Sequence, residues 1–163
     1  MYQASIKDMA VYFQRALATG LCRESDVRSW AEQTAGKYSG DVPQWLRDLS
    51  AQPSAMEQRL LEAVPGESND ELVWQLMFAN LGRSLRNRGF THGQVVYLLV
   101  SWAAAGSMPE EYRRMAYLFD DHHEGIAPGW FAEEELKKEM AAFFEQFRPY
   151  EELLPASPQT GRL

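Results

Sequence analysis

One short segment, FDDHHEG at residues 119–125, gathers most of the side chains in this sequence that could do chemistry. Carboxylate and imidazole groups are good ligands for divalent cations, so the segment suggests a metal site. The residues concerned are Asp120, Asp121, His122, His123 and Glu124. The alternative is that they form the charged end of a helix. The spacing of the ligands decides between these two interpretations.

The spacing argues against a metal ion. In a helix, the adjacent side chains of His122 and His123 point about 100° apart, whereas the two histidines of an HExxH site share one helix face. A calcium loop starting at Asp120 would need a bidentate glutamate at its twelfth place, where this chain has Phe131. We therefore predict no metal, no cofactor and no catalytic residue. As a helix end, the segment would have Gly125 as its left-handed cap and the histidines at the negative end of the helix dipole.

Other groups with chemical potential have structural explanations. Cys22 is the single cysteine, which excludes an intrachain disulfide and suits a reducing compartment. His92 lies at an expected helix start without an evident acidic partner in the sequence. Three arginines close a helix before Gly89; they either bind an anion or an acidic partner, or are solvated charges that the helix dipole favours. They are Arg83, Arg86 and Arg88.

The elements that must position these residues are helices. Apolar side chains recur three and four residues apart along the chain, and strand-like alternation of useful length is missing. Patterns of the capping-box type begin at Asp41, Ser54, Ser68, Thr91 and Ser107. We predict an all-α fold, a single compact domain of about seven helices over residues 1–154, with a flexible tail at 155–163. The segment 95–105 is apolar on all sides and is the expected central helix, wrapped by the others.

The composition favours a globular protein that binds another protein. The net charge of −7 disfavours nucleic acids, whose phosphates a binder must neutralise, and favours a basic partner. The N-terminus lacks the apolar core of a signal peptide, and the longest apolar run, VVYLLVSWAAAG, is about half of a membrane span. We therefore expect a cytoplasmic protein that binds neither membranes nor nucleic acids; its oligomeric state stays open.

The segment VRSWAEQTAGKYSGDVPQWLRDLSAQ, residues 27–52, resembles the helix–loop–WLxDLS segment of small acidic all-helical bacterial proteins of the toxin–immunity type. The matching residues are Trp30, Pro43, Trp45, Leu46, Asp48, Leu49 and Ser50. The resemblance implies a protein that binds and inhibits a basic toxin domain. It carries over no functional residue.

The distribution of charge suggests where a partner binds. Residues 120–152 contain ten acids and three bases, a net charge of −7 that equals the charge of the whole chain. Trp130 lies among them in an expected loop, either as an exposed anchor within a charged rim or folded back onto the core. The predicted partner-binding residues are Asp120, Asp121, Glu124, Trp130, Glu133 and Glu134. We expect a non-catalytic interaction module of the immunity or inhibitor kind; a small metal-dependent enzyme and a regulatory helical protein are the alternatives.

Overall fold

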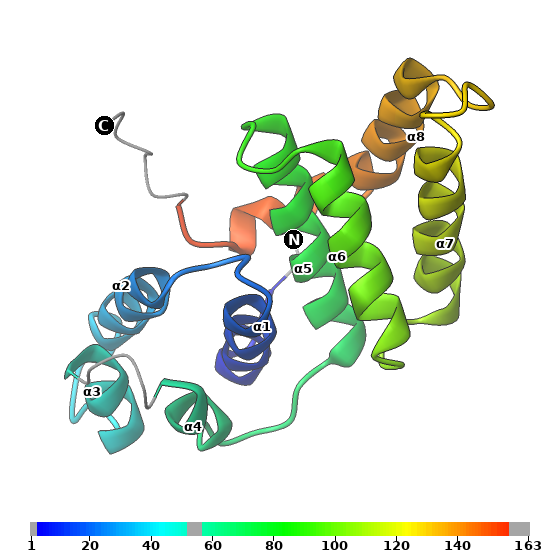
Figure 1. Cartoon of the computed structure of the whole chain (residues 1–163). Coiled ribbons are helices and arrows are strands. Elements are labelled where there is room, and N and C mark those ends of the chain that lie inside the picture. Colours follow the sequence, from blue (N-terminus) through cyan, green and yellow to red (C-terminus); the bar gives the residue numbers. More distant parts are fainter. Residues whose placement is uncertain (1–2, 52–56, 157–163) are drawn as a thin grey trace. The chain divides into compact units, whose positions relative to one another are not determined.

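The computed structural model describes residues 3–51 and 57–156, and within these ranges the chain forms helices and no strand (Figure 1). The α-helices are α1 (Ile6–Ala18), α2 (Glu24–Ala35), α3 (Gln44–Ala51), α4 (Glu57–Glu62), α5 (Asp70–Arg86), α6 (His92–Ala104), α7 (Glu110–Glu124) and α8 (Glu133–Glu145). A 3-10 helix, η2 (Arg148–Leu153), follows. The predicted all-α fold is confirmed.

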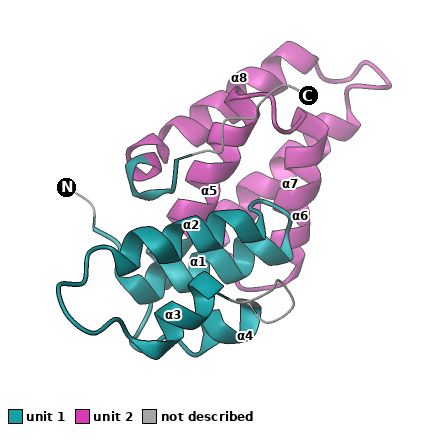
Figure 2. Cartoon of the chain, turned by 90° about the vertical axis from the view of Figure 1, so that its left-hand side faces the viewer, with its two compact units in different colours: residues 1–73, 152–163 teal, residues 74–151 magenta. Residues whose placement is uncertain are grey.

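The chain divides into two compact units (Figure 2). The first comprises residues 1–73 and 152–163, and the second comprises residues 74–151. The boundary falls inside α5, so this helix belongs to both units. The single domain over residues 1–154 stays a prediction, and most of the predicted tail lies outside the described residues.

In the first unit, a buried carboxylate joins α1 to the start of α5. Asp8 is buried and accepts hydrogen bonds from the backbone N–H of Ser5 at 2.8 Å and from that of Asn69 at 2.6 Å. Ser5 Oγ accepts in turn from the Asp8 N–H, so the pair forms a capping box at the start of α1. The rings of Phe13 and Trp30, with centroids 5.2 Å apart, pack α1 against α2.

In the second unit, the core is an aromatic cluster around Phe78 of α5. This side chain is fully buried. Its ring centroid lies between 4.8 and 6.3 Å from those of Trp74, Trp102, Tyr112, Phe143 and Phe147. These rings come from α5, α6, α7, α8 and the residues after α8, so the cluster ties the helices of this unit together.

The structure corrects the prediction that the segment 95–105 is a central helix wrapped on all sides. Residues 95–104 lie in α6, which buries Val95, Val96 and Leu99 on one face but leaves Tyr97 72% exposed on another. The helix with burial on nearly all sides is α5, where residues 72–82 are buried except for Gln75. A tyrosine can line the water side of an apolar helix because its hydroxyl stays solvated.

Only part of the predicted capping pattern appears in the structure. Thr91 forms the predicted box with Gln94: Thr91 Oγ1 accepts from the Gln94 N–H at 3.2 Å, and Gln94 Oε1 accepts from the Thr91 N–H at 2.9 Å. At α5, Asn69 rather than Ser68 accepts from the helix, through the Leu72 N–H. Helix α7 begins after Pro109 without a side-chain cap, so the prediction at Ser107 is wrong. Ser54 lies outside the described residues.

Candidate functional site

The predicted partner-binding residues come together at one end of a helical hairpin. Helices α7 and α8 pack side by side and are joined by the loop 125–132 (Figure 1). Three of the predicted acids lie in the last turns of α7 and two in the first turn of α8. We call this end of the hairpin the acidic tip; its residues are Asp120, Asp121, Glu124, Trp130, Glu133 and Glu134.

Trp130 is exposed at the acidic tip. Its exposed fraction is 86%, which rules out the alternative that it folds back onto the core. The loop is held by its backbone: the N–H groups of Trp130 and Phe131 both donate to the carbonyl oxygen of Gly125, at 2.9 and 3.0 Å. The indole therefore projects from an ordered turn.

Gly125 has a role other than the predicted one. Gly125 does end α7, but its φ of −72° is right-handed, so it is not the predicted left-handed cap. A Cβ there would lie 3.2 Å from the Cβ of Phe131, so Gly125 allows the loop to fold closely over the helix end. The left-handed position is Gly129, with a φ of +80°.

The adjacent histidines diverge, as the helical spacing predicts. His122 faces α8: its Nδ1 lies 2.7 Å from Glu139 Oε2, and its ring stacks on Phe131 with centroids 3.9 Å apart and planes 11° apart. His123 faces α6, where its Nε2 lies 3.1 Å from the point that a Cβ on Gly93 would occupy. Within the described ranges, no three histidine, cysteine or acidic side chains are grouped to hold a metal ion. The absence of a metal and of a cofactor stays a prediction.

The acids of the tip differ in how they are compensated. Glu133 and Glu134 share Lys137, with Nζ–Oε1 distances of 3.4 and 3.2 Å. Asp120, Asp121 and Glu124 form no ion pair within the part of the chain that the structure describes. The second group contributes most of the uncompensated negative charge; Asp121 and Glu124 are exposed and Asp120 is half-buried.

A second candidate site, which we call the histidine pocket, was not predicted. It is a cavity of about 480 Å³ in the second unit, lined by the end of α5, the start of α6, the end of α7 and the start of α8. Its polar lining residues are Arg88, Thr91, His92, His123, Glu133 and Lys137. Burial lowers the pKa of His92, and the positive charge of Lys137 lowers it further, while Glu133 and Glu134 act in the opposite direction.

The three arginines considered from the sequence do not form one cluster. Arg86 pairs with Glu151, and Arg83 donates to Asn80 Oδ1 at 3.4 Å. Arg88 alone of the three lines the histidine pocket. No sequence pattern links Arg88 to the other cationic and imidazole groups of the pocket. Arg88 follows α5, whereas His92, His123 and Lys137 lie on α6, α7 and α8.

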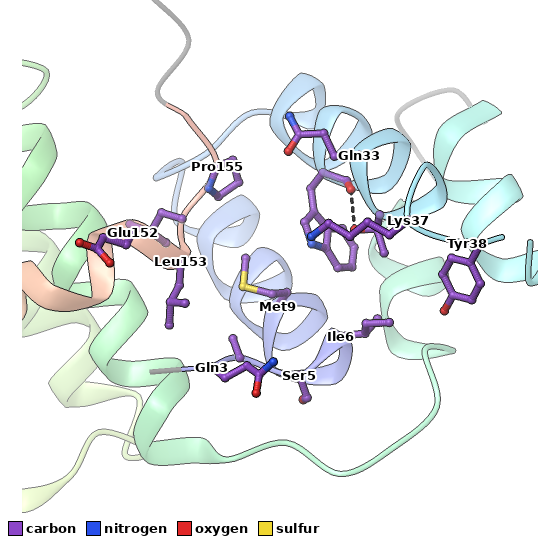
Figure 3. Close-up of a pocket in the computed structure, with 14 residues that line it drawn as sticks. Gln3, Ser5, Ile6, Met9, Gln33, Lys37, Tyr38, Glu152, Leu153 and Pro155 are labelled. Atoms are coloured by element: carbon purple, nitrogen blue, oxygen red, sulfur yellow. Dashed lines mark hydrogen bonds between the residues drawn. The ribbon is translucent and has the colours of Figure 1, made fainter. Parts of the chain in front are cut away.

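A further cavity, of about 530 Å³, lies in the first unit between α1, α2 and residues 152–155 (Figure 3). The side chains of Ile6 and Met9 line it from α1, that of Gln33 from α2, and that of Lys37 from the turn after α2 (Figure 3). Its ionisable groups belong to one lysine, one tyrosine and one glutamate. This set gives it less acid–base capacity than the histidine pocket has.

The residues that carry the resemblance to immunity-type proteins include buried side chains and side chains that form hydrogen bonds within α3. Leu46 and Leu49 are fully buried. Asp48 Oδ1 accepts a hydrogen bond from Gln44 Nε2 at 2.7 Å, and Ser50 Oγ donates to the Leu46 carbonyl at 2.9 Å. These contacts are within α3 and stabilise the helix.

No protein-family model matches the chain, and no curated protein or solved structure matches it either. Among the described helices, none combines the length and the apolar character needed to cross a membrane. The acidic tip and the histidine pocket are therefore the features of the described residues that bear on function.

Proposed function

We propose that the protein is a non-catalytic interaction module of the cytoplasm that binds a basic protein through the acidic tip, as an immunity or inhibitor protein does. The observation that carries the proposal is Trp130, which is 86% exposed on an ordered turn beside uncompensated acids. Exposing an indole of this size to water is unfavourable, and tryptophan is the residue type most enriched at binding hot spots.

The charges around Trp130 suit a basic partner. Asp121 and Glu124 are exposed and form no ion pair within the described ranges, so their field reaches solvent. Such rim charges raise the rate of association with a positively charged protein over a Debye length of about 8 Å at physiological ionic strength. The tryptophan would then be buried at the centre of the interface and slow dissociation.

The non-catalytic part of the proposal is supported by His122. An enzyme based on this histidine would need its ring free to exchange a proton with a substrate. Here the ring stacks on Phe131 and its Nδ1 bonds to Glu139, so one ring face and one of the two ring nitrogens have intramolecular partners. Cys22 is the single cysteine, so no intrachain disulfide can form, which is compatible with a reducing compartment.

The proposal is tested by Trp130→Ala, with Tyr97→Ala as the matched control because Tyr97 is a second exposed aromatic, at 72%, on α6. The parent protein is used to capture partners from a cell extract, and a basic partner identified by mass spectrometry is purified for binding kinetics. We expect Trp130→Ala to raise the dissociation rate and to cost about 2 kcal/mol of binding free energy. Tyr97→Ala should leave binding unchanged.

Circular dichroism and thermal unfolding of both variants establish that they remain folded. An acidic captured partner would refute the proposed face, and so would a Trp130→Ala variant that binds the basic partner with parental affinity.

A further inference from the structure

We propose that the histidine pocket binds a small organic anion, with a phosphate or carboxylate head group on an apolar body. The cavity is about 480 Å³, within the usual range of about 300–1,000 Å³ for small-molecule sites. This inference does not rest on the proposed partner binding, because it concerns a different class of ligand; Glu133 is the one residue that belongs both to the acidic tip and to the pocket lining.

The lining of the pocket contains both apolar and polar side chains. Leu136 is buried, and Ile126 and Phe90 are half-buried, so the body of a ligand would displace water from apolar surface. The polar lining residues include donors: the guanidinium of Arg88, the ammonium of Lys137 and the imidazoles of His92 and His123. These are the groups that bind phosphate and carboxylate oxygens in proteins.

The charge balance of the pocket favours an anion. Glu133 is the single acid in the lining, against the positive charges of Arg88 and Lys137. Lys137 forms ion pairs with both Glu133 and Glu134. Those side chains are 62% and 78% exposed, and ion pairs in such positions are weak. Arg88 forms no ion pair in the part of the chain described. A ligand head group would therefore have one uncommitted cation and one weakly held cation to bind.

The backbone at Arg88 supports a role for its side chain. Helix α5 ends in a Schellman motif: the Gly89 N–H donates to the Ser84 carbonyl at 2.8 Å, and the Arg88 N–H donates to the Leu85 carbonyl at 3.2 Å. The left-handed position of this motif is usually glycine, yet here Arg88 occupies it with a φ of +58° and Gly89 follows. Strained positions of this kind occur often at functional sites.

Gly93 completes the pocket. Gly93 follows His92 in the first turn of α6. Because Gly93 lacks a Cβ, the imidazole of His123 can lie against this turn. Each neutral imidazole carries one N–H that can donate to a bound anion. A long polyanion such as a nucleic acid is disfavoured, because the acidic tip would repel its other phosphates.

The ligand class is tested by titrating the protein with phenyl phosphate, benzoate and inorganic phosphate while recording the imidazole resonances by NMR. The chain has three histidines, and His122 does not line the pocket, so its resonances are an internal control. We expect saturable shifts of His92 and His123, but not of His122, with phenyl phosphate or benzoate. The tighter of these two identifies the head group, and inorganic phosphate should bind about tenfold more weakly than phenyl phosphate because it lacks the apolar body.

Arg88→Gly and Lys137→Gln should each weaken binding by about tenfold or more, since each removes a charged hydrogen-bond donor. Lys138→Gln is the matched control, because Lys138 is the next residue of α8, is 73% exposed and pairs with Glu135 outside the pocket. Glycine adopts the left-handed conformation freely, so Arg88→Gly should not lower the melting temperature. Absence of saturable shifts with both aromatic probes, or parental affinity in Arg88→Gly, would overturn the proposal.

Discussion

At the scale of single residues, the three histidines of this chain differ in their surroundings and therefore in what they can bind. His122 is held by Glu139 and Phe131, and its contacts are internal. His123, its neighbour in the chain, lies against Gly93 and lines the histidine pocket. His92 lines the same pocket with a lowered pKa, because burial penalises its charged form. The segment 119–125 therefore contributes one of the two histidines that line the pocket, and α6 contributes the other.

The lowered pKa of His92 predicts a pH dependence of stability. The folded protein takes up this proton at a lower pH than the unfolded chain, whose histidine titrates near 6.5. The stability is therefore fully present above pH 6.5 and declines as the pH falls from there through the folded pKa. We expect His92→Gln to lose less unfolding free energy than the parent between about pH 7.5 and about pH 5.5. Urea unfolding at both pH values measures this, and equal losses in the two proteins would contradict it.

At the scale of elements, the second unit depends on a close approach of α5 and α8. Gly82 of α5 faces Phe144 of α8, and a Cβ on Gly82 would lie 2.9 Å from the Phe144 Cβ. The Phe144 Cβ cannot move by side-chain rotation, so the helices themselves would have to separate. The aromatic cluster around Phe78 spans the same helices and would lose contacts if they did.

Gly82→Ala should therefore destabilise the protein by about 1–3 kcal/mol. This outcome opposes the usual gain of about 1 kcal/mol when alanine replaces glycine inside a helix. Gly40→Ala is the control, because a Cβ at Gly40 would meet open space and its φ lies outside the left-handed region. Urea unfolding of both variants tests the packing. A Gly82→Ala protein at least as stable as the parent would show that α5 and α8 can separate at little cost.

At the scale of the whole molecule, the uneven charge predicts how salt affects partner binding. Asp121→Asn with Glu124→Gln changes the net charge from −7 to −5 and removes exposed charge from the acidic tip. We expect a several-fold slower association with the basic partner at low salt, a smaller effect at high salt and an unchanged dissociation rate. Stopped-flow kinetics over a salt series measures this.

The matched control for this charge effect is Glu32→Gln with Asp41→Asn, which removes two exposed acids of the first unit and gives the same net charge. If both pairs slow association equally, the rate depends on net charge alone and the acidic tip has no special part in steering.

Features that depend on neighbours within about one helical turn could be predicted from the sequence. The helices follow from apolar periodicity, the capping box at Thr91 from residues three positions apart, and the divergence of His122 and His123 from the rotation between adjacent helical residues. The gathering of acids in residues 120–152 was also visible, because charge can be counted along a chain. These are local quantities, and tertiary packing changed them little.

Which faces are buried, and which distant residues meet, became visible only in the folded chain. Tertiary packing placed Trp130 in solvent, made α5 rather than α6 the most buried helix, and joined Asp8 to Asn69. It also formed the histidine pocket from the ends of four helices, whose residues no short motif connects. The physical reason is that helix formation is decided by contacts close in sequence, whereas burial and cavities depend on how apolar faces pack against one another.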